Sequence, residues 1–417
     1  MQLPTAVRQY LLITFNYWSF TLTDGALRML VVLHFHNLGY SPLSIAMLFL
    51  FYEIFGVVTN LVGGYLGARL GLNRTMNLGL GMQVFALGML LVPTSLLPLW
   101  LAGVPWVMAA QALSGIAKDL NKMSAKSAIK LLVPKGEQGK LYHWVALLTG
   151  SKNALKGAGF FLGGALLAVL GFNAAVAAMM ASLAVVWLLS LMLLKRDLGK
   201  AKNKPKFTEI FSKSTNVNIL SAARLFLFAA RDVWFVVALP VYLSSQFGWG
   251  HSAVGGFLAL WVIAYGIVQT QAPKLTGGKK SAVANALDAD AQATNVQVPD
   301  GRSAILWAFL LAFVPAFIAL ALMIGISPFV TVTLGLLLFG VLFAINSSLH
   351  SYLIVSYAND EAVSLDVGFY YMANAMGRLI GTVLSGWVYQ SYGLAACLWI
   401  STLLIATTAI ISIKLPR

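Results

Sequence analysis

Stretches of roughly 20 apolar residues, long enough to cross a bilayer as a helix, recur from one end of the chain to the other. No other feature constrains the fold as strongly. The composition agrees, because only 10% of the 417 residues are charged, against about 25% in soluble domains. The sequence therefore predicts an all-α, polytopic membrane protein. The twelve predicted spans are 10–33, 43–67, 75–95, 99–126, 141–170, 172–194, 216–243, 252–273, 303–324, 328–356, 364–391 and 393–413.

The positive charges are placed asymmetrically. The formal net charge is +15, but outside the spans Lys and Arg gather at the termini and in alternate loops. The odd-to-even loops 34–42, 96–98, 171, 244–251, 325–327 and 392 contain neither. The loop between the tenth and eleventh spans is a mild exception, because it is acidic (Asp360, Glu361 and Asp366) and also contains neither. This is the positive-inside pattern of membrane proteins. We therefore expect both termini in the cytoplasm, and a lipid bilayer rather than nucleic acid as the partner of these charges.

Two polar stretches divide the apolar pattern. Residues 195–215 are basic and polar, and residues 274–302 are rich in small and polar side chains without periodicity. We predict an N-terminal six-helix bundle over 1–194, a cytoplasmic linker over 195–215 and a C-terminal six-helix bundle over 216–417. Within the second bundle, we interpret 274–302 as a flexible cytoplasmic loop.

The two halves of the chain resemble each other. Residues 38–66 align with 247–275 without a gap, and 156–164 align with 378–386. The residues paired in this overlay are Gly159 with Gly381, Gly164 with Gly386, Lys156 with Arg378, and Asn121 with Asn346. Two pseudo-symmetric six-helix halves, related by an axis along the membrane normal, are typical of the major facilitator fold.

Ionisable side chains are distributed unevenly among the spans. The third, sixth, ninth and twelfth spans, which the major facilitator fold places against lipid, have none in their apolar cores. The other spans carry nine cations: Arg28, Lys118, Lys122, Lys126, Lys152, Lys156, Arg224, Arg231 and Arg378. They also carry four inward carboxylates, Asp24, Glu53, Asp119 and Asp232, while Asp366 at the start of the eleventh span is counted with the acidic loop before it. A charge at the bilayer centre costs at least about 2.5–3.5 kcal/mol, so each must face water, a partner or a ligand.

The balance of these charges indicates the kind of ligand. Three pairs can neutralise locally: Asp24 with Arg28, Asp119 with Lys122, and Asp232 with Arg231. Nine cations against four carboxylates still leave a surplus of five positive charges. A small anionic substrate would supply the missing compensation. The sequence therefore predicts a polar central cavity that accepts an anion.

A row of lysines runs along the fourth span and beyond its end. Lys118, Lys122, Lys126 and Lys130 are four residues apart, so they lie on nearly the same helix face, where like charges destabilise the helix. This lysine row would draw an anion inward from the cytoplasm. For Lys126 and Lys130 the alternative is that they extend to the lipid headgroups. Lys118 and Lys122 lie deeper in the span, which favours a position in the cavity.

Four cations near the middle of their spans form the predicted centre of the site: Lys152, Lys156, Arg231 and Arg378. Arginine holds an oxyanion by paired hydrogen bonds, and lysine acts as a point charge. Arg28 and Arg224 are second candidates, because they could instead be structural partners of carboxylates. The remaining predicted substrate-binding residues are Lys118, Lys122 and Asn121.

Coupling to protons requires a carboxylate that changes its protonation state. Burial favours the protonated form of a carboxyl group, so the candidates are Asp24, Glu53, Asp119 and Asp232. A fixed ion pair is the alternative for each of them. Glu53 has no cation nearby in the sequence and is the first candidate.

The sequence contains few features of a metal-binding protein or an enzyme. Cys397 is the only cysteine, so the chain cannot build a multi-thiolate metal site. The sequence has no HExxH, GxSxG or phosphate-binding loop motif, the signatures of common enzyme sites. We expect no cofactor and no bound metal, and a membrane-embedded enzyme is the weakest of the alternatives.

Two sets of segments resemble known families. GYLGARLGLNRTM (64–76) resembles the major facilitator loop signature G-x-L-x-D-R-x-G-R-[RK], although Ala68 replaces the signature's Asp. The segments 15–42, 48–83 and 114–134 are similar to the ArsJ family of organoarsenical efflux permeases. That resemblance covers most of the chain and is more specific than the loop signature.

The resemblance to the ArsJ family implies a function. Members export 1-arseno-3-phosphoglycerate, an arsenate ester made by glyceraldehyde-3-phosphate dehydrogenase, and so confer arsenate resistance. We would then expect a monomeric transporter in a bacterial inner membrane that exchanges this anion for protons. The alternatives are an exchanger of other phosphate esters or organic anions, and a sensor that binds anions without transporting them.

Overall fold

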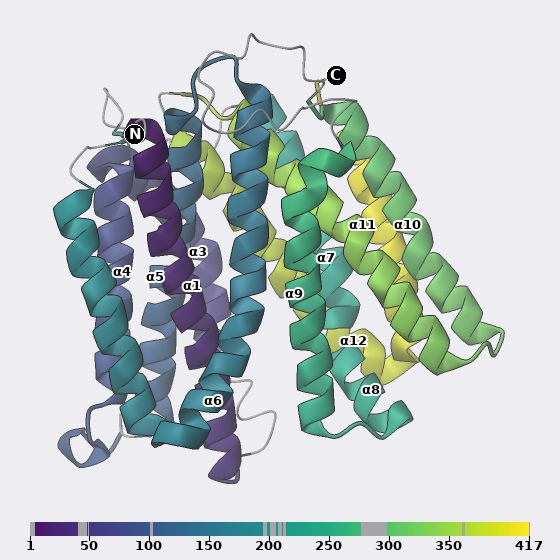
Figure 1. Cartoon of the computed structure of the whole chain (residues 1–417). Helices are drawn as coiled ribbons and strands as arrows, with labels where there is room; N and C mark the ends of the chain where they lie inside the picture. The colour runs from purple at the N-terminus through teal and green to yellow at the C-terminus, as the bar shows by residue number, and fades with distance from the viewer. Residues whose placement is uncertain are drawn as a thin grey trace. The chain divides into compact units, whose positions relative to one another are not determined.

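The computed structural model describes residues 5–40, 48, 50–100, 103–194, 198–200, 206, 211, 214–276, 298–360 and 363–416. Helices make up almost all of this part (Figure 1), and no strand occurs in it. The helices are α1 (Thr5–Asn37), α3 (Leu50–Leu70), α4 (Leu72–Leu90), α5 (Val104–Leu132), α6 (Gln138–Leu193), α7 (Thr215–Phe235), α8 (Ala238–Phe247), α9 (His251–Thr276), α10 (Gly301–Met323), α11 (Pro328–Tyr357) and α12 (Val363–Ser412).

Six segments of the described chain are long and apolar enough to cross a membrane, judged by length and composition. They are Gln138–Leu193, Thr215–Phe247, Ala253–Thr276, Gly301–Met323, Pro328–Tyr357 and Val363–Ser412. α6 has 56 residues and α12 has 50. At about 1.5 Å per residue, each is far longer than the roughly 30 Å hydrocarbon core. Each of these two helices therefore accounts for two of the predicted spans.

A single glycine interrupts each of the two long helices. Gly171 has φ 75° and ψ 176°, and Gly393 has φ 76° and ψ −175°. This backbone region is open to glycine and strained for residues with a Cβ. The predicted one-residue connection at 171 is confirmed, and the one predicted at 392 lies one residue later.

The seventh predicted span, 216–243, corresponds to one segment long and apolar enough to cross a membrane, Thr215–Phe247, but the structure divides this segment into α7 and α8. Pro240 explains the division: proline has no N–H, and its ring clashes with the carbonyl four residues earlier. The N–H groups of Val237 and Ala238 donate instead to Ser385 Oγ of α12, at 3.4 and 3.1 Å. The break in the helix is therefore compensated by a side chain from another helix.

The ends of the third and fourth predicted spans also differ. α4 ends at Leu90 rather than at residue 95, and Pro93 follows, a residue that cannot continue a helix. α5 begins at Val104 rather than at residue 99 and continues to Leu132, past the predicted end at residue 126. The whole lysine row is therefore helical.

The two predicted polar connections lie mostly outside the described residues. The predicted loop 274–302 is shorter than expected, since α9 continues to Thr276 and α10 begins at Gly301. Residues 277–297 lie outside the described part, as does most of the predicted linker 195–215.

The chain forms two compact units. Unit 1 comprises Met1–Leu132, Lys152–Phe211 and Asn359–Met372, and unit 2 comprises Val133–Ser151, Ser212–Ala358 and Ala373–Arg417. The start of α12 thus packs in unit 1, where a Cβ on Gly368 would lie 2.8 Å from Gly64 Cα of α3. The start of α6 packs in unit 2, where the Tyr142 hydroxyl lies 2.8 Å from Thr276 Oγ1 of α9. These units do not coincide with the two predicted bundles, because α6 and α12 each contribute to both.

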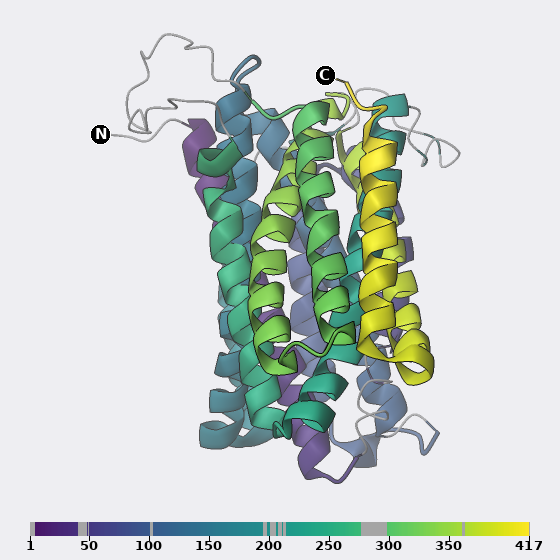
Figure 2. The ribbon, with the colours of Figure 1, turned by 90° about the vertical axis from the view of Figure 1, so that its right-hand side faces the viewer.

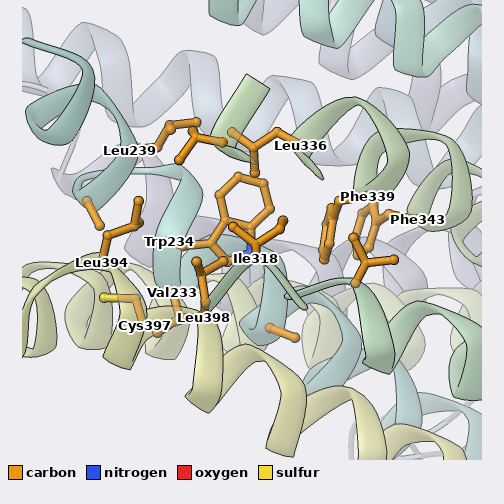
Figure 3. Packing of buried hydrophobic residues seen from close by; sticks show 14 of the residues in the cluster. Val233, Trp234, Leu239, Ile318, Leu336, Phe339, Phe343, Leu394, Cys397 and Leu398 are labelled. Carbon is orange, nitrogen blue, oxygen red and sulfur yellow. The ribbon is translucent and has the colours of Figure 1, made fainter. Parts of the chain in front are cut away.

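An aromatic core holds unit 2 together (Figure 3). Trp234 of α7 lies edge-on to Phe339 of α11 with 4.8 Å between ring centroids, and Phe339 stacks on Phe343 at 5.5 Å. Cys397 and Leu398 of α12 belong to the same cluster. Burial of each large side chain contributes about 1.5–3 kcal/mol, so the cluster fixes α7 against α11 and α12. α10 packs beside α11 in the same unit (Figure 2).

Glycines bring α6 close to α1, and α12 close to α7. A Cβ on Gly159 would lie 2.7 Å from a carbonyl oxygen of α1, and one on Gly381 would lie 2.7 Å from a carbonyl oxygen of α7. The paired glycines of the sequence overlay thus make equivalent helix crossings. The second pair does not, because Gly164 meets only the end of a leucine side chain at 3.7 Å and Gly386 meets nothing within 4 Å.

These contacts predict different outcomes for two alanine substitutions. Gly381→Ala is expected to destabilise the protein by about 1–3 kcal/mol, because its methyl group would press on the backbone of α7. Gly386→Ala is the matched control and should be neutral or stabilising, since alanine favours a helix by about 1 kcal/mol over glycine. Thermal unfolding of the purified full chain would measure both. Equal melting temperatures for the two variants would contradict the assignment of this crossing.

Candidate functional site

Tyr52 of α3 connects three of the predicted charged residues in unit 1. Its hydroxyl donates to the two carboxylate oxygens of Asp24 on α1, at 2.9 and 3.1 Å. Its ring carries the Lys118 ammonium of α5 at 3.7 Å and the Arg28 guanidinium of α1 at 5.5 Å from the centroid. Tyr52 itself is 2% exposed. One tyrosine therefore holds a carboxylate at its edge and two cations at its faces.

Asp119 of α5 pairs with the lysine predicted for it. Lys122 Nζ lies 2.6 Å from Asp119 Oδ1, which confirms the predicted local pair, and Lys118 Nζ lies 4.0 Å from Oδ2. Oδ2 is buried and accepts no hydrogen bond from the described residues. Gly56 of α3 leaves room for this oxygen, since a Cβ there would lie 3.2 Å from it.

The C-terminal end of the lysine row meets the start of α12 within unit 1. Lys122 and Lys126 both lie over the ring of Tyr371, at 4.7 and 5.0 Å from its centroid. Lys130 Nζ lies 3.6 Å from Asp360 Oδ1. Lys126 is buried in this position, so the alternative in which it extends to the lipid headgroups is not what the structure shows.

Lys152 and Lys156 lie on α6 at the crossing with α1. The Lys156 carbonyl oxygen would lie 2.7 Å from a Cβ on Gly25, the residue that follows Asp24. Both lysines are half-buried, and Lys156 Nζ is 6.0 Å from the Phe160 ring centroid. The glycine-rich crossing therefore brings this pair of cations to the helix that carries Asp24.

Asp232 of α7 holds two of the predicted central cations in unit 2. Arg231 contacts Asp232 Oδ1 at 2.5 Å, and Arg378 Nε of α12 donates to Oδ2 at 3.2 Å. The Asp232 side chain is fully buried, whereas those of Arg231 and Arg378 are 15% and 30% exposed. The predicted Asp232–Arg231 pair is confirmed. The prediction missed that Arg378 shares the same carboxylate, which leaves this trio with one net positive charge.

Arg224 of α7 is held by neutral groups and an aromatic ring. Its Nε donates to Asn374 Oδ1 at 2.9 Å, and its Nη1 donates to the Ser347 carbonyl at 3.3 Å. The guanidinium lies over the Phe228 ring at 3.9 Å, and Arg231 lies over the same ring at 4.8 Å. Arg224 thus keeps its positive charge in a buried position.

Asn121 lies apart from the lysine row. It is on the face of α5 that packs against Gly79 of α4, and its overlay partner Asn346 donates to the Trp307 carbonyl of α10 at 2.8 Å. The two asparagines therefore face equivalent helix pairs, α4 with α5 and α10 with α11. The contact of Asn121 is made by its backbone N, and its side-chain amide is buried without a hydrogen-bond partner among the described residues. Its contact with the substrate stays a prediction. Glu53 lies on α3, and its side chain is outside the described residues.

Aromatic rings are the component that the sequence analysis missed. Tyr52 and Phe228 each support two cations, and neither was among the predicted site residues. A cation over a ring face is stabilised by about 0.5–2 kcal/mol. Unlike a carboxylate, the ring does not neutralise the charge. Cations held in this way can still attract an anion and donate to it.

The described ranges contain no group of three or more His, Cys, Asp or Glu side chains that could hold a metal ion. Cys397 is buried in the core of unit 2 as a free thiol. Its surroundings there are apolar side chains, as in other structural cysteines.

Comparison with protein families matches residues 10–284 to the Major Facilitator Superfamily. No curated protein matches the chain. Solved structures with the same fold are numerous. A bacterial homologue of the iron transporter ferroportin, in an outward-facing state, has a TM-score of 0.75 at 16% identity, covering 97% of this chain and 98% of that one.

Two further structures are similar over nearly their whole length. The human organic anion transporter MFSD10 (TETRAN) has a TM-score of 0.73 at 16% identity, covering 98% of this chain and 100% of that one. The proton:xylose symporter XylE, bound to 6-bromo-6-deoxy-D-glucose, has a TM-score of 0.71 at 12% identity, covering 97% and 95%. The family and these structures are transporters, which confirms the predictions of the fold and of a chain that is not an enzyme. The chain is a multi-pass membrane protein that belongs to the major facilitator superfamily.

Proposed function

We propose that this transporter exports an organic anion by alternating access. The substrate that we assign is the arsenate ester 1-arseno-3-phosphoglycerate, so the protein would confer arsenate resistance on a bacterial cell. It would lie in the inner membrane as a monomer with both termini in the cytoplasm. Glyceraldehyde-3-phosphate dehydrogenase would supply the ester on the cytoplasmic side.

The observation that carries the anionic substrate is how the cations are held. The Lys118 ammonium lies over the ring of Tyr52, and those of Lys122 and Lys126 lie over the ring of Tyr371. Arg224 is held by a ring and neutral acceptors. A ring supports a cation without neutralising it, although Lys122 also pairs with Asp119 at 2.6 Å. The predicted intramembrane cations outnumber the predicted carboxylates in both units, six to three in unit 1 and three to one in unit 2. A buried charge surplus of this sign is costly unless an anion compensates it.

The choice of the arsenate ester rests on the resemblance of 15–42, 48–83 and 114–134 to the ArsJ family. The ester carries a phosphate and an arsenate group, and several fixed cations suit such a multiply charged anion. One solved protein with this fold is an organic anion transporter, so the fold can accommodate cargo of this class.

Everted membrane vesicles would test the proposal directly. Glyceraldehyde-3-phosphate dehydrogenase, its triose phosphate substrate, the oxidised nicotinamide cofactor and arsenate are added outside, and arsenic inside the vesicles is measured. Arsenic should accumulate only when the dehydrogenase is present. Lys156→Ala and Arg378→Ala should each lower uptake about 10–100-fold, because a charge-assisted hydrogen bond contributes about 1.5–3 kcal/mol. Lys414→Gln at the exposed C-terminus is the control. Native uptake by both site variants would refute the proposal.

The same assay separates the rival functions. A broad exchanger of phosphate esters would accumulate added 3-phosphoglycerate inside the vesicles, whereas a transporter specific for the ester would bind it without accumulating it. A sensor would bind the ester in reconstituted vesicles without any flux.

The exchange of the anion for protons stays a prediction. Asp24 accepts from the Tyr52 hydroxyl, and Asp119 and Asp232 pair with cations, so each of the three already has a partner. An imposed pH gradient across the same vesicles would show whether protons move opposite to the arsenic or with it.

A further inference from the structure

α11 carries a polar stretch in the middle of an apolar helix. Asn346, Ser347, Ser348, His350 and Ser351 are all buried, with 1% exposure or less. Buried polar groups are costly unless they are hydrogen-bonded, so an apolar helix does not carry five of them without compensation. Part of that compensation is visible, because Ser348 Oγ donates to a carbonyl of α9 at 3.4 Å and the Ser347 carbonyl accepts from Arg224.

His350 is the titratable member of this stretch, in which Asn346 Oδ1 and Ser351 Oγ also have no hydrogen-bond partner among the described residues. Its side chain is fully buried, and neither ring nitrogen has a hydrogen-bond partner among the described residues. A neutral imidazole has one donor and one acceptor, and each costs about 1–3 kcal/mol when buried without a partner. The function proposed above does not use this group.

The charged group that faces His350 is a cation. Arg224 of α7 donates to the Ser347 carbonyl, one helical turn before His350, and acts on it electrostatically. α9 contributes Tyr265 and Gln269, which are hydrogen-bonded to each other at 3.0 Å.

The other neighbours of the polar stretch are neutral. α12 contributes Asn374, which accepts from Arg224. α10 contributes a backbone carbonyl, and the start of α6 contributes Tyr142, whose ring centroid lies 4.8 Å from that of Tyr352. No carboxylate among the described residues is hydrogen-bonded to His350, and the charged group that acts on its imidazole is Arg224.

We propose that His350 is the proton-binding site of this transporter and that its proton binds together with the anion. This rests on the proposed function, in which Arg224 is one of the cations that attract the substrate. Burial in apolar surroundings and the nearby charge of Arg224 both favour the neutral imidazole. An anion bound near Arg224 offsets that charge, so a proton can enter and turn both ring nitrogens into donors.

The sense of this coupling follows from charge. A proton adds to the positive charge around Arg224 and an anion subtracts from it, so each binds better when the other is present. The proton would then travel with the anion, opposite to the exchange predicted from the sequence. The sign of the pH effect on anion binding distinguishes the two.

Titration calorimetry on the purified full chain would test this, with 3-phosphoglycerate as the probe. Measurements in two buffers of different ionisation enthalpy, between about pH 8 and about pH 6 where imidazole titrates, give the number of protons taken up with each anion. His350→Gln keeps a donor and an acceptor but cannot titrate. His143→Gln is the matched control, because His143 lies on an exposed face of α6.

The native chain should take up a proton fraction that grows as the pH falls, and binding should tighten by up to about tenfold per pH unit. His350→Gln should bind with near-native affinity at about pH 8 but lose this uptake and this tightening. The His143→Gln control should behave like the native chain. Native-like uptake by His350→Gln, or weaker binding at low pH, would overturn the inference while leaving the proposed function intact. No binding of the probe or of the ester by the native chain would overturn both.

Discussion

Replacing Asp232 with asparagine is expected to lower the yield of folded protein more than replacing either of its arginine partners. The carboxylate is fully buried and compensates Arg231 at 2.5 Å and Arg378 at 3.2 Å. Asparagine has nearly the same shape but no charge, so both guanidinium groups would lose their counterion. Removing one partner of a buried ion pair costs about 3–5 kcal/mol, which is a large part of the roughly 5–15 kcal/mol that stabilises a typical fold.

Thermal unfolding of detergent-purified protein, together with the yield of monodisperse protein, would measure this effect. A second variant separates charge from packing. Asp232→Asn combined with Arg378→Gln restores the balance around Arg231 only in part, but it should recover much of the lost stability. If the single variant melted like the native chain, or if the double variant were no better than the single one, Asp232 would not be the shared counterion.

Replacing Lys118 with glutamine is expected to lower export of the ester by about 10–100-fold without unfolding the protein, because one charge-assisted contact of about 1.5–3 kcal/mol is lost. Folding should survive because Asp119 keeps its close partner Lys122 at 2.6 Å, whereas Lys118 is 4.0 Å away. The Lys118 ammonium instead lies over the Tyr52 ring. The substitution therefore removes a positive charge without leaving a carboxylate that lacks a cation partner.

Lys118→Arg provides the control for charge, since it keeps the cation and its attraction to the ring. It should retain more export than the glutamine variant in the same vesicle assay, at matched protein levels. Equal export by native, arginine and glutamine forms would show that the charge at this position is not used by the substrate.

The fold was predictable because the membrane imposes a length and a polarity on every span. The one-residue connections are Gly171 and Gly393, both with positive φ. The first was predicted at its position, and the second lies one residue after the predicted position 392. The division between α7 and α8 was missed, although Pro240 was visible in the sequence. Prolines also occur inside helices such as α10, so the residue alone does not say where a helix ends.

The site was predictable only where partners are close in sequence. Asp119 with Lys122, and Asp232 with Arg231, follow from helix geometry or direct adjacency. Arg378 lies 146 residues from Asp232, so no local pattern could show that contact. The same holds for Tyr52, whose partners come from two other helices. Its position beside Glu53 was the one available signal.

The single-residue interruptions at Gly171 and Gly393 have a mechanical consequence. In the major facilitator fold, each long helix runs as a hairpin, and here one glycine alone joins its two arms. A connection of one residue cannot lengthen, so a shift of one arm along its axis must move the other arm as well. Inserting a few flexible residues after Gly171 should therefore uncouple the arms while leaving each arm's own packing untouched. With such an insertion, one arm could move along its axis without moving the other.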